Sequence, residues 1–318
     1  MKHHRAGIAV VLGLFVGSGV GWAEPPADEP ERTEEPQPAP QAPPNRPERR
    51  IPPEVLQQLI EQQRARQQQR QRPQVPQTPI PEDFEPGMNL LGDPGFEAHE
   101  RWDEGQPWWN SLKVQGSQAW VEFDIAEGEG RSGGRAAHLH MDSSAQPGPT
   151  RVHGVVQEMV PPAMPRYVSG WYRVENWERG AEKQYLQTVV VSRRPSNAPA
   201  NLMRARGGNY SVQLAMTLAG AEEPPLFMGN RKFEVTGPAE PVEGAWVFFE
   251  FDLHELFTKH WGRVPEDSDG VRIFFEVRYD KKPSAEPVAR CDVYFDDLYF
   301  GDSSRAESAD ASDEPASD

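Results

Sequence analysis

The stretch YVSGWYRVEN (residues 167–176) is one of nine short runs, rich in β-branched and aromatic residues, that decide the fold of this 318-residue chain. Gly, Pro, Asn and Asp, which favour turns, separate the runs. No long segment has helical periodicity, although residues 253–260 are compatible with a single helical turn. The pattern therefore predicts an all-β sandwich or barrel. The other eight runs cover residues 119–125, 136–141, 152–159, 185–192, 210–218, 246–253, 271–279 and 292–300.

Residues 1–23 have the layout of a secretory signal peptide, with basic residues, an apolar run and small residues before Glu24. The apolar run is shorter than the ~20 residues that span a bilayer, and no later segment approaches that length. We expect a secreted or periplasmic protein that does not span a membrane. Cleavage removes Lys2 and Arg5 and takes the formal charge from −16 to −18, which disfavours nucleic acid as a partner.

The composition predicts one folded domain, residues 88–302, between two disordered segments. Residues 24–87 are dominated by Pro, Glu, Gln and Arg and are expected to form a tether, with a short helix at 53–71 that is a candidate for binding a protein partner. Residues 303–318 are mostly Ser, Ala, Asp and Glu and are expected to form an acidic tail.

Four blocks of the predicted domain resemble the jelly-roll carbohydrate-binding modules of xylanases and cellulases, within the galactose-binding-like group. They are NLLGDPGFE (89–97), RSGGRAAHLHM (131–141), YVSGWYRVEN (167–176) and the pair AWVFFEFDL (245–253) with VYFDDLYFG (293–301). Pro94 and Gly95 favour a tight turn that would place Phe96 in the core. The resemblance implies a β-jelly-roll that binds a polysaccharide or a cell-envelope glycan and is not an enzyme.

The same resemblance implies a structural calcium ion (Ca²⁺) where the first and last strands meet. The positions that match its ligands are Gly95, Glu97, Ser132 and Asp296. Oxygen ligands of this kind suit a hard cation. An ideal strand would send Asp296 and Asp297 to opposite faces, so only one of them is expected to point at the ion.

Exposed aromatic rings are the expected sugar contacts, because the C–H faces of a pyranose are apolar and stack on indole. Tryptophans are dense in the loop HERWDEGQPWWN, although one member of the Trp108–Trp109 pair is expected to point inward. Trp171 and Trp246 lie inside predicted strands and are expected to be buried. The candidate ligand-binding residues are Trp102, Asp103, Gln106, Trp108, Trp109, Trp177 and Trp261.

Three other patterns favour structural interpretations. Glu122, Asp124 and Glu127 have the spacing of the catalytic strand in laminarinase-type retaining glycosidases, but the same spacing recurs at Glu250, Asp252 and Glu255, which indicates solvated strand faces. His138 and His140 alternate on one strand without a third ligand nearby in sequence, which favours ordinary surface or packed histidines over zinc. Cys291, the one cysteine, is expected to be a small buried hydrophobe.

Three classes of function therefore stay open. The first is a secreted, monomeric, non-catalytic glycan-binding protein. The second is an envelope or protein-interaction module with the same fold and no sugar binding. The third, with the weakest support, is a retaining glycosidase.

Overall fold

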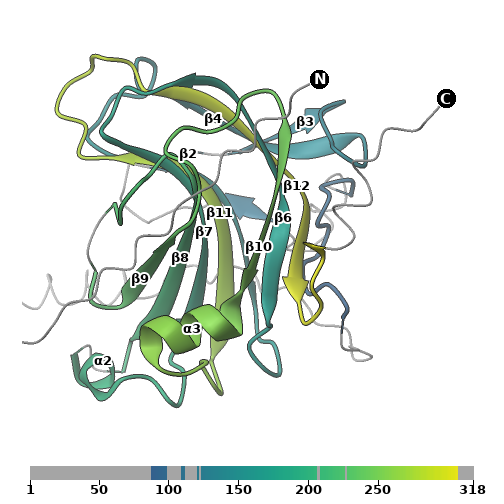
Figure 1. Ribbon diagram of the computed structural model, residues 1–318, viewed down its shortest axis with the longest axis vertical. Coiled ribbons are helices and arrows are strands. Elements are labelled where there is room, and N and C mark those ends of the chain that lie inside the picture. Colours follow the sequence, from purple (N-terminus) through teal and green to yellow (C-terminus); the bar gives the residue numbers. More distant parts are fainter. Residues whose placement is uncertain are drawn as a thin grey trace, which may run out of the picture. The chain divides into compact units, whose positions relative to one another are not determined.

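The computed structural model describes residues 87–98, 109–111, 120–121, 123–205, 208–225 and 228–306. The predicted tether, the tail beyond residue 306 and most of the tryptophan-rich loop lie outside these residues. Two sheets form the layers of a sandwich (Figure 1). This confirms the predicted all-β architecture. Among the described residues, no helix has the length and apolar character needed to cross a membrane.

The larger sheet has the strand order β1-β5-β11-β7-β8-β9, and β2 pairs with β5 beside this path. The β2–β5 and β8–β9 pairings are parallel, and the other pairings in this sheet are antiparallel. Its strands are β1 (Asn110–Ser111), β2 (Trp120–Val121), β5 (Arg151–Met159), β7 (Lys183–Arg193), β8 (Ser211–Ala219), β9 (Arg231–Val235) and β11 (Gly270–Asp280).

The smaller sheet is antiparallel, with the order β10-β6-β12-β4-β3. Its strands are β3 (Asp124–Glu127), β4 (Arg135–Asp142), β6 (Tyr167–Glu178), β10 (Trp246–Asp252) and β12 (Arg290–Gly301). Apolar residues from the inner faces of both sheets form the main core, for example Leu139, Val155, Val190, Phe275 and Phe295. Alternate residues of each strand therefore face outward.

Two short helices, α2 (Ala200–Ala205) and α3 (Leu253–Trp261), lie near the lower end of the sandwich in Figure 1. Helix α3 is longer than the single turn that the sequence predicts. Its N-cap residue, Asp252, accepts the backbone N–H of Glu255 at 3.0 Å. Gly262 ends the helix with φ 75°, where a side chain would be strained, and donates its N–H to the Thr258 carbonyl. Strand β9 and helix α2 were not expected from the sequence.

The opening motif joins the last strand. Asn89 donates to the Leu298 carbonyl and accepts the Phe300 N–H, and the Leu90 N–H donates to the Phe300 carbonyl. In the turn that follows, the Phe96 N–H donates to the Asp93 carbonyl at 3.2 Å. Phe96 is fully buried, as the sequence predicts.

Candidate functional site

Strand β11 carries a row of charged and aromatic side chains on the face of the larger sheet that points away from the core. Side chains alternate along a strand. The inner residues are Val271, Ile273, Phe275, Val277 and Tyr279, all in the main core. The outward residues are therefore Arg272, Phe274, Glu276, Arg278 and Asp280.

Five side chains on this outward face form a connected network, which we call the polar cluster: Tyr185, Gln187, Glu276, Arg278 and Asp280. In the β7–β11 register, Tyr185 lies opposite Arg278 and Gln187 opposite Glu276. The Arg278 guanidinium donates to both Asp280 oxygens, at 3.0 and 2.6 Å, and contacts Glu276 at 3.5 Å. The Tyr185 hydroxyl donates to Asp280 at 2.9 Å, and the Gln187 amide donates to Glu276.

The polar cluster is buried although it faces away from the core. Tyr185 and Gln187 are fully buried, and Glu276 and Asp280 are nearly so. Burial raises the pKa of Tyr185, with smaller contributions from the charges of Asp280 and Glu276. Burial lowers the pKa of Arg278, but Glu276, Tyr185 and Asp280 outweigh it and hold that pKa above its ordinary value. Tyr185 therefore keeps its proton and Arg278 its charge.

One polar atom of the polar cluster, Gln187 Oε1, has no hydrogen-bond partner among the described residues. The Gln187 amide nitrogen must face the Glu276 carboxylate, which fixes the orientation of the amide. The Oε1 atom itself is buried. A buried unpaired acceptor is uncommon in folded proteins and calls for an explanation, such as a bound water or ion.

A second ionic group lies on the same face. Glu158 is almost fully buried and accepts hydrogen bonds from Arg272, at 2.6 Å, and from Arg193. Phe274, half-buried, lies along β11 between Arg272 of this group and Glu276 of the polar cluster. The outward face thus presents an aromatic ring between two sets of charged hydrogen-bonding groups.

The backbone gives these side chains room. Gly154 lies opposite Glu276 in the β5–β11 register. A Cβ at Gly154 would lie 2.9 Å from the Glu276 Cβ and 3.0 Å from the Phe275 carbonyl. Any larger residue at this position would therefore displace β11 or the Glu276 side chain.

The sequence analysis did not identify these residues, although their signal is present. VRIFFEVRYD (Val271 to Asp280) places a charged residue at four of five alternate positions, and such alternation normally indicates a strand face in water. The strand assignment was correct. The burial of this face could not be read from the alternation.

The tryptophan-rich loop is largely outside the described residues, which include none of Trp102, Asp103, Gln106 and Trp108. Trp109 is described and lies in the core, stacked on Phe96 at 5.1 Å between ring centroids. Its indole N–H donates to the Asp93 carbonyl at 2.9 Å. As a ligand-binding candidate Trp109 was therefore wrong, because both its ring and its polar atom are used in packing; it is the inward member of the pair.

The structure does not bring Trp177 and Trp261 together. Helix α3 starts beside the first strand residue of β6, where the Leu253 N–H donates to the Arg166 carbonyl, whereas Trp177 lies ten residues further along β6, about 33 Å away. The half-buried Trp177 donates its indole N–H to Glu240 at 2.7 Å. Of the two tryptophans expected inside strands, Trp171 is buried and Trp246 is only half-buried.

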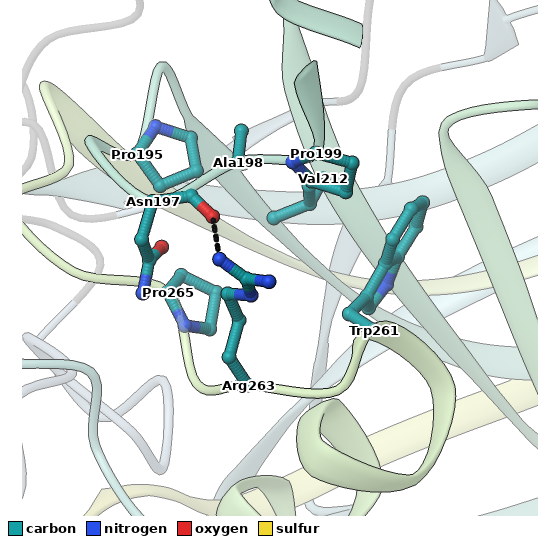
Figure 2. Close-up of a pocket in the computed structure, with 8 residues that line it drawn as sticks. All are labelled: Pro195, Asn197, Ala198, Pro199, Val212, Trp261, Arg263 and Pro265. Carbon is teal, nitrogen blue, oxygen red and sulfur yellow. Dashed lines mark hydrogen bonds between the residues drawn. The ribbon is translucent and has the colours of Figure 1, made fainter. Parts of the chain in front are cut away.

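Trp261 borders a pocket of about 180 Å³ (Figure 2). Three prolines line it, together with Arg263, which donates to the Asn197 carbonyl at 3.4 Å. That volume includes open solvent, so the enclosed space is smaller still and the pocket alone does not suit a sugar chain.

The residues that the family resemblance implies for calcium are close together. Asp296 is almost fully buried, and its Oδ2 accepts the Arg131 N–H at 2.6 Å. Its Oδ1 lies 3.4 Å from the position that a Cβ on Gly95 would take. The Glu97 carboxylate lies against Gly133, where a Cβ would overlap it at 2.0 Å. The opening turn, the loop before β4 and strand β12 therefore meet at these carboxylates.

Asp297 also contacts this loop, although an ideal strand would send its side chain to the opposite face from Asp296. A β-bulge interrupts the strand here, and Asp297 has φ 48°. Its carboxylate accepts hydrogen bonds from the Ser132 hydroxyl and, at 3.2 Å, from the Arg131 guanidinium.

The groups present are of the kind that bind a hard cation, although in this structure both carboxylates accept backbone N–H groups, Asp296 Oδ1 that of Asp297 at 2.7 Å and Glu97 that of Arg135 at 2.9 Å. Carboxylate, hydroxyl and carbonyl oxygens are the ligands that calcium prefers. Burial, and then the charge of Asp297, raise the pKa of Asp296 to about 6, against the effect of backbone N–H groups. A bound cation would favour the charged form of this buried carboxylate.

The recurring carboxylate spacing at Glu250, Asp252 and Glu255 has structural roles. Glu250 accepts the Ser304 hydroxyl at 2.6 Å, Asp252 caps helix α3, and Glu255 supplies the N–H that this cap accepts. The first occurrence of this spacing lies at and before β3, and its members are Glu122, whose structure is not described, and the exposed Asp124 and Glu127.

No family model matches this sequence, and neither does any curated protein. Several solved structures are similar to it. One is the CBM61 module TmCBM61 in complex with β-1,4-galactotriose, at 14% identity and TM-score 0.33, covering 68% of this chain and 100% of the other. A second is the CBM22 tandem of Xyn10C from Paenibacillus barcinonensis, at 15% identity and TM-score 0.35, covering 71% of this chain and 52% of the other.

A third is a CBM28 module specific for non-crystalline cellulose, at 10% identity and TM-score 0.32, covering 67% of this chain and 96% of the other. Carbohydrate-binding modules, the group that the sequence resembles, are thus among the structures similar to this chain. At such identities and TM-scores the likeness identifies no ligand. Function has to be argued from the side chains of this chain.

Proposed function

We propose that the protein binds a glycan on the outward face of the larger sheet, at the polar cluster. The observation that carries the proposal is the unpaired, buried Gln187 Oε1 inside a network of charged hydrogen-bonding groups of the described residues. A sugar hydroxyl is both a donor and an acceptor, and it could donate to this oxygen once the side chains that cover the fully buried Gln187 move aside.

The other groups on this face suit the same ligand. Arg278 is held by two carboxylates in a fixed orientation, and a planar guanidinium can bind neighbouring oxygens with defined geometry. Phe274 offers a half-buried apolar ring between the two ionic groups, suited to the C–H face of a pyranose.

Binding without cleavage fits the carboxylates of the polar cluster. A retaining glycosidase needs two carboxyl groups about 5–5.5 Å apart, and an inverting one about 6.5–9.5 Å apart. Glu276 and Asp280 are almost fully buried and are bridged by one guanidinium, that of Arg278, so neither carboxyl group is free to meet a glycosidic oxygen or a water.

The proposal also includes the loop tryptophans as stacking side chains, on the strength of their density in the sequence. Trp102 and Trp108 are the candidates, with Asp103 and Gln106 as polar contacts. The signal-peptide pattern of residues 1–23 supports a location outside the cytoplasm, where the ligand would be a polysaccharide or an envelope glycan.

Affinity electrophoresis on gels that contain β-1,4-galactan, xylan or hydroxyethyl cellulose tests this function. At least one polymer should retard the unmutated protein. Gln187→Leu removes the unpaired acceptor and also the amide donor to Glu276; in a variant that thermal denaturation shows to be folded, it should weaken binding about tenfold, or ~1.4 kcal/mol for one hydrogen bond. Ser192→Ala, on the opposite face of the same strand, where the hydroxyl pairs with Ser268, is the matched control and should bind normally.

Absence of retardation on every polymer, confirmed on a glycan array, would refute glycan binding and favour a protein-interaction module. Retardation that Gln187→Leu leaves unchanged, but that Trp102→Ala and Trp108→Ala remove, would move the site to the loop.

We also propose that calcium binds between Glu97 and Asp296 and has a structural role. The convergence of three chain segments on two carboxylates supports this proposal. Neutralising the charge of the buried Asp296 would stabilise the junction between the opening turn and β12.

A further inference from the structure

A second cluster of metal-ligating side chains lies on the outward face of the smaller sheet. His138 and His140 are alternate residues of β4, so both point to the same face. Strand β12 is their antiparallel partner and places Asp292 directly opposite His140. The third ligand that the local sequence lacks is therefore supplied by a strand 152 residues further along the chain.

The three side chains converge on one point. His138 Nε2 and His140 Nδ1 each lie 2.8 Å from the same Asp292 oxygen, Oδ1. The three candidate ligand atoms all lie within 4.8 Å of one another. Tetrahedral coordination with bonds of about 2.0–2.2 Å puts ligand atoms about 3.3 Å apart. Each histidine–carboxylate distance would therefore lengthen by roughly half an ångström, and the two histidine nitrogens, at most 4.8 Å apart, would move to that spacing.

Neighbouring groups hold these ligands in place. The His138 ring stacks on Tyr294 at 4.8 Å between centroids and an interplanar angle of 11°, and the Arg173 guanidinium covers Tyr294 at 4.4 Å. Asn176 donates to the second Asp292 oxygen, Oδ2, at 2.8 Å, which leaves Oδ1 directed at the histidines. Partners of this kind orient ligands in protein metal sites.

We propose that His138, His140 and Asp292 bind a divalent transition-metal ion of the zinc class. Imidazole nitrogens favour Zn²⁺, Ni²⁺ and Cu²⁺ over Ca²⁺ and Mg²⁺, which prefer oxygen ligands. The site is thus distinct in chemistry from the oxygen-rich cluster at Asp296.

Three protein ligands leave at least one coordination position open. The His140 side chain is 48% exposed, so this position is accessible to solvent or to an anionic group of a second molecule. The ion would also link β4 to β12 across the sheet. The site lies on the opposite sheet from the polar cluster, so it does not depend on glycan binding.

Titration calorimetry with ZnCl₂ on the full chain tests the site. His3 and His4 are adjacent in the sequence and could bind metal ions themselves, so His3→Ala/His4→Ala is the reference protein. We expect one high-affinity Zn²⁺ per chain and a higher melting temperature with Zn²⁺ than with Mg²⁺. His140→Ala, at an exposed position, and Asp292→Asn should each lower the affinity at least about tenfold.

His260→Ala is the matched control, because His260 also pairs with a carboxylate, Glu234 at 2.7 Å, but belongs to no comparable cluster among the described residues. It should bind Zn²⁺ like the reference protein. Absence of Zn²⁺ binding by the reference protein, or affinity that neither His140→Ala nor Asp292→Asn reduces while both variants remain folded, would overturn the proposal.

Discussion

Lowering the pH from 7.5 to 5 should destabilise the domain through one buried histidine, His153 on β5. Its side chain faces the core, and neither ring nitrogen has a hydrogen-bond partner among the described residues. Burial, with smaller contributions from the positive charges of His140, Arg151 and His138, lowers the pKa of His153 to about 3. The folded state therefore holds the neutral ring at every pH above that value.

The direction follows from proton linkage. In the unfolded chain His153 takes up its proton near pH ~6.5, so below that pH the unfolded state binds more protons than the folded state. The stability that the neutral ring contributes is complete above pH ~6.5 and is lost as the pH falls towards about 3. By pH 5 the loss is about 2 kcal/mol, which corresponds to ~4–8 °C in melting temperature for a domain of this size.

Thermal denaturation of the unmutated protein and of His153→Leu at both pH values measures this effect. Leucine cannot take up a proton. The melting temperature of His153→Leu should therefore fall less between pH 7.5 and 5 than that of the unmutated protein, by ~4–8 °C. Equal falls for His153→Leu and the unmutated protein would refute the reasoning.

Three further outcomes are expected. Trp109→Ala should cost ~3–5 kcal/mol of stability in chemical denaturation, because the ring is buried against Phe96, and an unchanged midpoint would contradict its place in the core. Chelation of calcium should lower the melting temperature and Asp296→Ala should abolish that sensitivity, whereas a melting curve indifferent to chelator would remove the calcium proposal. Limited proteolysis should remove residues 24–86 first and leave a fragment that begins near Met88, since the composition of that segment offers no core; protection of the segment would show that the boundary is wrong.

The strands were predictable because they are rich in β-branched and aromatic residues and are separated by turn-forming residues. The inner faces of β8, β10 and β11 are apolar at every second position, whereas β5 and β7 also turn polar side chains such as His153 and Thr188 inward. The five residues of β9, RKFEV, were missed because charged residues alternate with apolar ones over a length too short to distinguish from a loop. The length of helix α3 was underestimated. Its N-cap residue, Asp252, is also the last residue of β10, so the sequence shows no separate start signal for the helix.

The candidate sites were harder to predict, because they depend on register between distant strands. Glu276 and Gln187 are 89 residues apart, and only the β7–β11 pairing brings them together. Asp292 joins His138 and His140 in the same way. Single positions such as Gly95 and Asp296 were found from a family motif, but the bulge at Asp297 that turns its carboxylate to the same loop leaves no recognisable signal in the sequence.

The hydrogen bonds between Asn89 and β12 have a mechanical consequence. Because they join the first and last segments of the domain, Gly87 and Arg305 lie within 3.4 Å, measured from the Gly87 carbonyl to the Arg305 guanidinium. A force applied to the two ends would break these few hydrogen bonds one after another. The sandwich itself would bear the force only after they have broken. The same closeness would let the domain be spliced into a surface loop of another protein, or be cut elsewhere and rejoined here, without stretching the chain.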